Sequence, residues 1–316
     1  MKKSILLFAA VLLSGSLTLG SCTEDEATTP TPANNPPAQS IAAIAQADTA
    51  FSYLVAALTR AELVTTLSGS GTFTVFAPTN AAFRASGISL DAINTLPVAD
   101  LTEILLYHVL GAKVEAAQVT TGYVNTLADG PAANSKLSAY VSTAAGVRIN
   151  NAASVVQADV QANNGVIHVI DRVLIPADIA TLASANANLS IVIGAVATAN
   201  LTSALVNNPA NNDLLTLFAP ENNAFTVSGL DLSAVSVADL TNILLYHVVS
   251  GNVRSAAVAT GMVPTLNPTA SLAINVAGGV ITINPGTGTT NNAGVVTADI
   301  QATNGVVHII NRVLVP

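Results

Sequence analysis

An internal duplication constrains the fold most, because most of the 316-residue chain consists of two similar copies of one segment. Three segments of the first copy return in the same order in the second: 74–83 returns as 216–225, 99–109 as 238–248, and 164–176 as 304–316. The offsets are 142, 139 and 140 residues, so the spacing of the segments is kept. Short solenoid repeats run about 20 to 50 residues, so this period indicates duplication of a whole domain. We place the two domains at 41–176 and 177–316.

Each copy opens with segments that have the spacing of helices. Phe51, Leu54 and Leu58 recur on one helical face. A short β run, 73–76, then stops at Pro78, which cannot donate to a sheet ladder. Thr79 or Asn80 can cap a following helix, and Asn222 offers the same cap in the second copy.

The later part of each copy has the composition of strands. Short helical turns are expected at 91–96 and 231–235, and a helix is expected to end near Tyr107. The segments 166–174 and 306–314 are dense in β-branched residues and predict a mostly buried strand that closes each domain. Helices come first and strands later, which predicts an α+β fold.

The N-terminus has the pattern of a bacterial lipoprotein signal. Lys2 and Lys3 precede an apolar stretch that is too short to span a bilayer, and small residues lead to Cys22. The sequence around Cys22 resembles a lipobox, which implies a signal peptide at 1–21 and lipid on the cysteine; an ordinary secretory signal is the alternative. The Pro- and Thr-rich segment 22–40 reads as a spacer.

Acidic residues follow the cysteine at 24–26 and are similar to the surface-export signal of Bacteroidetes lipoproteins. We therefore expect an outer-membrane protein that is held by its lipid anchor and faces the cell exterior. Cys22 is the only cysteine, so no disulfide can form within the chain.

Composition removes two broad classes of function. The net charge is −8 and the ten Lys and Arg residues are scattered, so nucleic-acid binding through clustered basic residues is not expected. Past the N-terminus we find no stretch of 18 uninterrupted apolar residues, which excludes a polytopic membrane protein.

The repeated motifs carry a resemblance to a known family. TVFAPTNAAF and TLFAPENNAF resemble the first signature of fasciclin-like (FAS1) domains, and NGVIHVIDRVLIP and NGVVHIINRVLVP resemble the second. The resemblance implies two tandem units, each a wedge-shaped β-sandwich with helices packed around it. It also implies a secreted or surface-tethered module for cell adhesion or matrix contact.

The resemblance further implies candidate partner-binding positions, because Tyr-His and Asp-Ile segments are proposed adhesion sites in animal members. The matching residues here are Tyr107, His108, Asp159, Val160, Tyr246, His247, Asp299 and Ile300. The first copy departs from the pattern with Val160. A bacterial chain has no reason to meet the animal partner, so that partner is not carried over.

The four histidines occupy two equivalent positions in each copy, which invites a metal or catalytic interpretation. Each lies in an apolar run, so we expect structural roles instead, and no metal. If the closing strand is regular, His168 shares a face with Arg172, and His308 with Arg312. We interpret these pairs as an interior polar lock or a rim feature, with an anion site as the alternative.

Motifs typical of nucleophilic, phosphate-binding, zinc-protease or EF-hand sites are missing from the sequence. We therefore predict a non-enzymatic adhesion protein without a cofactor, whose partner is a protein or glycan on other cells or matrix. An envelope lipoprotein that binds a polysaccharide or small molecule is the alternative; its aromatic candidates are Tyr123 and Tyr140. An enzyme is a third hypothesis. The oligomeric state is left open.

Overall fold

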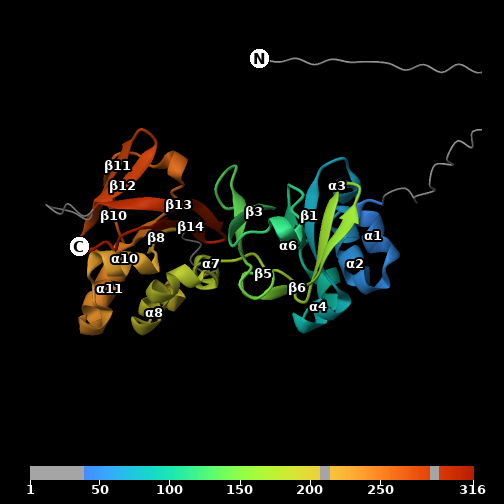
Figure 1. The fold of residues 1–316 in the computed structure, drawn as a ribbon, viewed down its shortest axis with the longest axis horizontal. Coiled ribbons are helices and arrows are strands. Elements are labelled where there is room, and N and C mark those ends of the chain that lie inside the picture. Colours follow the sequence, from blue (N-terminus) through green and yellow to red (C-terminus); the bar gives the residue numbers. More distant parts are fainter. Residues whose placement is uncertain (1–38, 207–213, 285–291) are drawn as a thin grey trace, which may run out of the picture. The chain divides into compact units, whose positions relative to one another are not determined.

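The computed structural model describes residues 39–206, 214–284 and 292–316, and Ala38–Pro316 group as one compact unit. The expected signal peptide, Cys22 and nearly all of the expected spacer lie outside the described residues. Both copies show the expected α+β plan, with helices first and strands later (Figure 1). We call residues 41–176 the first repeat and residues 177–316 the second repeat.

The elements of the first repeat are as follows. Its helices are α1 (Ile41–Ala47), η1 (Thr49–Phe51), α2 (Ser52–Arg60), α3 (Val64–Ser68), α4 (Asn80–Ala85), α5 (Leu90–Thr95), α6 (Val98–Tyr107) and η2 (Ala116–Gln118), where η marks a 3-10 helix. Its strands are β1 (Phe73–Pro78), β2 (Val109–Leu110), β3 (Gly122–Asp129), β4 (Lys136–Ser142), β5 (Arg148–Ile149), β6 (Ala153–Ala162) and β7 (Gly165–Ile170).

The second repeat follows the same order. Its helices are α7 (Ile179–Ala185), η3 (Ala187–Leu189), α8 (Ser190–Thr198), α9 (Thr202–Leu205), α10 (Asn222–Ser228), η4 (Leu232–Ala234), α11 (Val237–Tyr246) and η5 (Ser255–Ala257). Its strands are β8 (Leu215–Pro220), β9 (Val248–Ser250), β10 (Gly261–Pro264), β11 (Ser271–Ala277), β12 (Val280–Asn284), β13 (Ala293–Ala302) and β14 (Gly305–Ile310).

The strands of each repeat have the same spatial order. The first repeat is ordered β2-β1-β7-β6-β5-β4-β3, and the second is ordered β9-β8-β14-β13-β12-β11-β10. The first long strand pairs in parallel with the last, which places Phe76 opposite His168 and Phe218 opposite His308. The long strand β6 pairs with β5 at its start and with β7 along the rest, so it joins the two halves of the sheet.

The glycine of the Asn-Gly pair at the start of the last strand is required for steric reasons. Gly165 has a φ of +152°, and a Cβ built on it would lie 1.9 Å from the backbone oxygen of Phe73. A Cβ built on Gly305 would likewise lie 1.9 Å from the backbone oxygen of Leu215. Glycine is therefore the residue that permits the parallel strands to approach at this point.

The asparagine before that glycine fastens the first helix of its repeat. The buried Asn164 side chain accepts a hydrogen bond from the Ile41 backbone N–H at 2.9 Å and donates to the Leu67 oxygen at 2.7 Å. Asn304 holds Ile179 in the same way at 2.9 Å. Asn164 and Asn304 thereby supply two of the partners that helix ends need.

The expected helix caps are partly confirmed. Thr79 caps α4 by accepting from the Ala82 backbone N–H. The expectation that Asn222 caps the matching helix is wrong, because Glu221 holds the cap position without a side-chain bond. The Asn222 Oδ1 atom accepts instead from the Ile191 backbone N–H, as Asn80 does from Tyr53. The hydrogen bond to Ile191 therefore uses the Asn222 side chain that local sequence would assign to a helix cap.

The closing strands are shorter than predicted. Strand β7 ends at Ile170, where its pairing with Val155 ends, rather than at Leu174. Beyond the strand, the Leu174 backbone N–H donates to the Nε2 atom of His108 at 2.9 Å. The β-branched pattern continues past Ile170 because Val173 and Leu174 are buried in the hydrophobic core, not because they belong to the sheet.

The two repeats contact each other directly within the compact unit. The Gln301 backbone N–H donates to the Ser138 Oγ atom at 3.0 Å, and both residues are buried. The Asn151 side chain donates to the Ala185 oxygen at 2.9 Å, and the Tyr123 hydroxyl donates to the Leu182 oxygen at 3.1 Å. Strand β4 of the first repeat thus meets α7 and β13 of the second.

Candidate functional site

A bulge interrupts the long strand of each repeat at the predicted Asp motif. The register shifts between Gln157 and Val160 in β6, and the same shift occurs in β13. Asp159 and Asp299 have φ values of 61° and 59°, a left-handed conformation that aspartate tolerates better than most residues. The backbone of the bulge therefore already favours aspartate at this position.

The bulge turns the aspartate toward the short 3-10 helix that precedes β3 or β10. Asp159 accepts a hydrogen bond at Oδ1 from the Ala116 backbone N–H at 2.8 Å. Asp299 accepts from the Ser255 backbone N–H at 2.7 Å and from the Ser255 hydroxyl. Each carboxylate thus caps the start of η2 or η5, where a negative group is stabilising.

A buried histidine lies beneath each bulge. His168 accepts from the Asp159 backbone N–H at Nδ1, 3.3 Å away, and its Nε2 atom is 2.9 Å from the Val114 oxygen. These partners assign a neutral ring with its proton on Nε2. His308 repeats both contacts with Asp299 and Val253, and burial lowers its pKa.

The Tyr-His segment that ends helix α6 or α11 lies in the interior. His108 donates from Nδ1 to the Ile104 oxygen at 2.7 Å and accepts at Nε2 from Leu174. His247 does the same with Ile243 and Leu314. Burial lowers the pKa of His108 and of His247 to about 4, so both rings are neutral at pH 7.

The tyrosines beside these histidines are equally enclosed. The Tyr107 hydroxyl donates to the Ser138 oxygen at 2.8 Å and accepts from the Asn150 side chain at 2.9 Å. Burial raises the pKa of Tyr107 to about 12. The Tyr246 hydroxyl donates to the Ser271 oxygen at 3.1 Å. Tyr107 and Tyr246 therefore hold their helix against β4 or β11.

Burial divides the predicted partner-binding residues into two groups. Asp159 is exposed and Asp299 is half-buried, so both can meet a partner at the surface. Val160 is half-buried, whereas Ile300 is buried. The Tyr-His residues are 2% exposed or less, so a partner cannot touch them in this fold; they are Tyr107, His108, Tyr246 and His247.

The predicted sharing of one face by histidine and arginine is not what the structure shows. His168 lies in β7, but Arg172 follows the end of that strand and is exposed. The Arg172 guanidinium donates to the Ala85 oxygen at 3.2 Å, whereas the two ring nitrogens of His168 contact Asp159 and Val114. Strand alternation stops at Ile170, so it does not extend to Arg172. Arg312 likewise follows the end of β14 and is half-buried, whereas His308 is buried.

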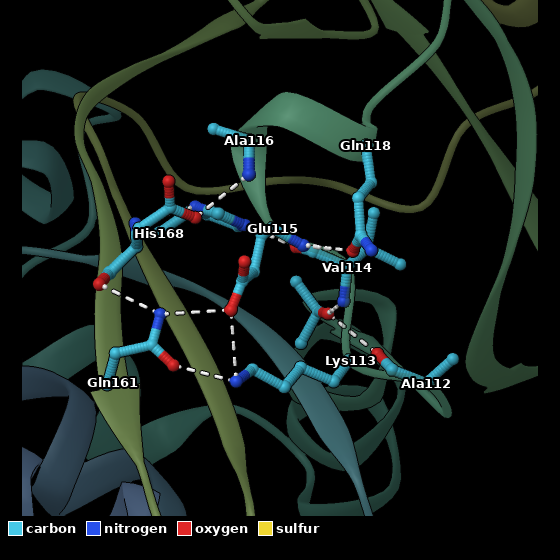
Figure 2. Close-up of polar contacts among 10 residues, drawn as sticks. Ala112, Lys113, Val114, Glu115, Ala116, Gln118, Gln161 and His168 are labelled. Carbon is cyan, nitrogen blue, oxygen red and sulfur yellow. Dashed lines mark hydrogen bonds and ion pairs between the residues drawn. The ribbon is translucent and has the colours of Figure 1, made fainter. Parts of the chain in front are cut away.

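A surface network beside Asp159 was not predicted from the sequence. Lys113 Nζ lies 3.1 Å from Glu115 Oε1 and donates to Gln161 Oε1 at 2.7 Å. Gln161 in turn donates to Glu115 at 3.3 Å, so the three side chains form a closed ring (Figure 2). The equivalents in the second repeat are Asn252, Arg254 and Gln301, found by the 139- and 140-residue offsets. Aligning the two copies would have revealed this reversal of charge.

The remaining chemistry-bearing residues are dispersed. Within 39–206, 214–284 and 292–316, no group of three or more His, Cys, Asp or Glu residues has the arrangement to hold a metal ion. In the same ranges no single helix is long and apolar enough to cross a membrane; two pairs of helices pass that test jointly but bend by 103° and 105°.

The fold and the site together define a duplicated α+β module with interior histidines that bond to the backbone and a bulged aspartate that is exposed in the first repeat and half-buried in the second. The Fasciclin domain profile matches residues 49–176 and 187–316, so the chain belongs to the fasciclin domain family. This confirms the resemblance drawn from the repeated motifs.

Relatives with known sequences include bacterial and animal proteins. Protein sll1483 of Synechocystis is 44% identical over 143 residues, which cover 44% of this chain and 74% of that protein. Transforming growth factor-beta-induced protein ig-h3 of Sus scrofa is 31% identical over 217 residues, 67% of this chain and 29% of that protein. A solved FAS1 domain pair from the insect cell adhesion molecule Fasciclin I is 18% identical, with a TM-score of 0.48 over 84% of this chain and 96% of that chain.

Proposed function

We propose that the chain is a non-enzymatic, lipid-anchored protein of the outer surface that displays two fasciclin modules for adhesion to other cells or matrix. The observation that carries the proposal is the pair of fasciclin domains behind a lipobox-like Cys22. The fasciclin resemblance associates such modules with cell adhesion and matrix contact.

The chemistry of the interior supports a binding role over a catalytic one. All four histidines use both ring nitrogens for contacts with the backbone, at distances from 2.7 to 3.3 Å. A general base needs a free nitrogen within reach of the proton that it takes. These rings therefore contribute to the architecture of each repeat and are not presented to a substrate.

The anchor and the adhesive role are tested in one set of strains. Adhesion to host cells, matrix proteins and sibling cells is measured for a deletion strain, for the wild-type complement and for a Cys22→Ala complement. We expect adhesion to be lost on deletion, restored by wild type and not restored by Cys22→Ala. An unchanged phenotype on every surface contradicts the adhesive role.

Lipid and location are measured separately from adhesion. Mass spectrometry of the N-terminal peptide should show acyl chains on Cys22, and protease added to intact cells should cut the chain. An unmodified thiol at Cys22 contradicts the anchor. Protection from protease in intact cells, with cleavage after lysis, contradicts exposure on the outer face.

The role of the bulged aspartate is isolated by Asp159→Asn. Asparagine tolerates the left-handed backbone and keeps an Oδ1 acceptor for Ala116, so only the charge is removed. If the Asp159 carboxylate contacts the partner, this variant loses adhesion while its unfolding temperature falls by no more than about a few degrees, the size expected for loss of a capping charge. Asp91→Asn, on an exposed residue of α5, serves as the charge control.

A further inference from the structure

A polar cavity of about 300 Å³ lies where the second repeat meets the first. Strands β3 and β4 form one side of it, and the bulged part of β13 forms the other. The buried hydrogen bond from Gln301 to Ser138 fixes these two sides against each other. Its lining includes the side chains of Tyr123, Asn125, Lys136, Arg254, Thr297 and Asp299.

Arg254 is incompletely satisfied in this cavity. Its guanidinium makes one long hydrogen bond, from Nη1 to the Asn134 oxygen at 3.4 Å. Its Nε atom is buried and has no partner within the described part of the chain. Buried donors without an acceptor are rare in native proteins. The Nη2 atom also has no hydrogen bond to a described residue and, unlike Nε, is not buried, so the Nη end of the guanidinium presents donors to a ligand that supplies acceptors.

A second cation lies in the same cavity, although the whole chain has only ten Lys and Arg residues. Lys136 Nζ contacts Asp129 at 2.6 Å and donates to the Leu127 oxygen at 2.9 Å, but its side chain remains 44% exposed. The negative charge of Asp299 is already held by the backbone and hydroxyl of Ser255. Among the charged groups of the cavity, the two cations thus keep more open hydrogen-bonding capacity than the carboxylate.

Neutral polar groups surround the two cations. The Thr297 hydroxyl and the Asn125 side-chain nitrogen have no hydrogen bond to any described residue, so both are available to a ligand. The ring of Tyr123 is fixed by its hydroxyl contact with Leu182 and by Tyr140, whose ring centroid is 4.9 Å away. These are the groups that recognise the hydroxyls and the face of a sugar ring.

We propose that this cavity binds a carboxylate-bearing sugar unit of an acidic polysaccharide. A planar guanidinium matches a carboxylate through two parallel N–H bonds, and the accessible Nη1 and Nη2 atoms of Arg254 supply them. Thr297 and Asn125 take ring hydroxyls, and Lys136 adds charge. The volume is at the lower end of ligand pockets, which span about 300 to 1,000 Å³.

The first repeat does not offer a second copy of this site. Glu115 occupies the position of Arg254, and it is already closed into the ring with Lys113 and Gln161. A carboxylate would be repelled there. The inference rests on the proposed surface role for its biological setting, but binding itself is independent of adhesion and can be measured on the purified protein.

The test is isothermal titration of the purified full chain, in detergent, with a short oligogalacturonide. A neutral malto-oligosaccharide, a sulfated carrageenan oligosaccharide and a glutamate oligopeptide serve as comparison ligands. We expect the oligogalacturonide to bind at least roughly tenfold more tightly than each comparison ligand. Its affinity should fall as salt is raised, because the contact is charged.

Variants locate the binding in the cavity. Arg254→Gln should weaken oligogalacturonide binding by roughly tenfold or more, and Arg254→Lys should weaken it by less. Arg84→Gln removes an exposed arginine of α4 and should leave the affinity unchanged. Thr297→Val tests the cavity again without touching Arg254, and should weaken binding several-fold if a ring hydroxyl meets that side chain.

Several results would overturn this proposal. They are no heat of binding for the oligogalacturonide at millimolar concentration, equal affinity for the glutamate peptide or the sulfated sugar, and equal losses in Arg254→Gln and Arg84→Gln. If the purified protein binds the oligogalacturonide but cells show no adhesion, only the proposed function is contradicted. If cells adhere but the protein does not bind the oligogalacturonide, only this inference is contradicted.

Discussion

The two repeats share their interior and differ on the surface beside the bulge. His168 and His308 have the same partners, and so do Asn164 and Asn304. At the surface, Glu115 of the first repeat is satisfied by Lys113, whereas Arg254 of the second has a buried donor without a partner. Duplication therefore preserved the residues that define the fold and left the neighbouring surface free to change its charge.

The largest expected loss of stability comes from substituting the glycine that opens the last strand, and it tests whether the two repeats depend equally on that glycine. Gly165→Ala and Gly305→Ala each place a Cβ 1.9 Å from a backbone oxygen, so each should cost about 4 kcal/mol or more of its own repeat's stability. Urea unfolding followed by circular dichroism measures the loss, and hydrogen exchange locates it.

Gly194→Ala in helix α8 is the control for these variants. A Cβ at Gly194 meets nothing within 4 Å, so alanine should stabilise the helix by up to about 1 kcal/mol. Tolerance of alanine at Gly165 but not at Gly305 would show that the two sheets are not equivalent.

The next effect is a loss of stability in acid that both repeats share. His108 and His247 have pKa values of about 4 in the folded chain, below the ordinary value of 6.5. The unfolded chain therefore binds more protons between these values, so stability is complete above about pH 6.5 and is lost as pH falls toward 4. The loss should be roughly 3 kcal/mol for each histidine.

Urea unfolding midpoints from pH 4 to pH 7 measure this loss. His108→Gln and His247→Gln should each reduce the pH dependence by a similar amount, because the two environments match. A stability that is flat across this interval would contradict the neutral, buried state of both rings.

A smaller effect comes from a difference in packing. The second repeat has an apolar cavity of about 30 Å³ lined by Leu215, Val192 and Leu244, among others. Phe73 is the equivalent of Leu215 and packs against the first repeat's core. Leu215→Phe should fill the cavity and stabilise the second repeat by about 0.7 kcal/mol, at roughly 24 cal/mol per Å³.

Thermal unfolding measures this gain, and Phe73→Leu is the reciprocal variant. It should open a cavity in the first repeat and lower stability there. Destabilisation by Leu215→Phe would mean that the second repeat packs around leucine in a way that the comparison with Phe73 does not capture.

The smallest change in stability is expected at the surface beside the bulge, where the two repeats differ most in charge. Lys113 and Glu115 have side chains that are 39% and 42% exposed, and exposed ion pairs contribute about 0 to 1 kcal/mol. Lys113→Ala should therefore change the unfolding free energy by less than about 0.5 kcal/mol. A loss above 2 kcal/mol by urea unfolding would show that the ring with Gln161 helps to hold the bulge.

Much of the fold could be predicted from the sequence because duplication marks the residues that both copies need. The cap by Thr79 and the helix ending at Tyr107 follow from local chemistry and are observed. The short β run is also observed, but it includes Pro78 instead of stopping before it, because Pro78 still lies in register with Ile170. The role of Asn222 could not be predicted, because its partner Ile191 is 31 residues away.

The site was less predictable because exposure depends on tertiary packing. The Tyr-His motif marks a helix end, but nothing local shows that His108 will be enclosed by Leu174, 66 residues later. Arg254 stands out only when the first repeat packs beside it and its Nε is buried without an acceptor. Such a feature arises between the repeats and is invisible in either copy alone.

The position of the last strand has a consequence for synthesis. Strand β7 lies between β1 and β6 rather than at an edge, and β14 lies between β8 and β13. A growing chain cannot complete either sheet until the final residues of that repeat have left the ribosome, because the central partner is made last. Each repeat therefore lacks a complete sheet through most of its own translation.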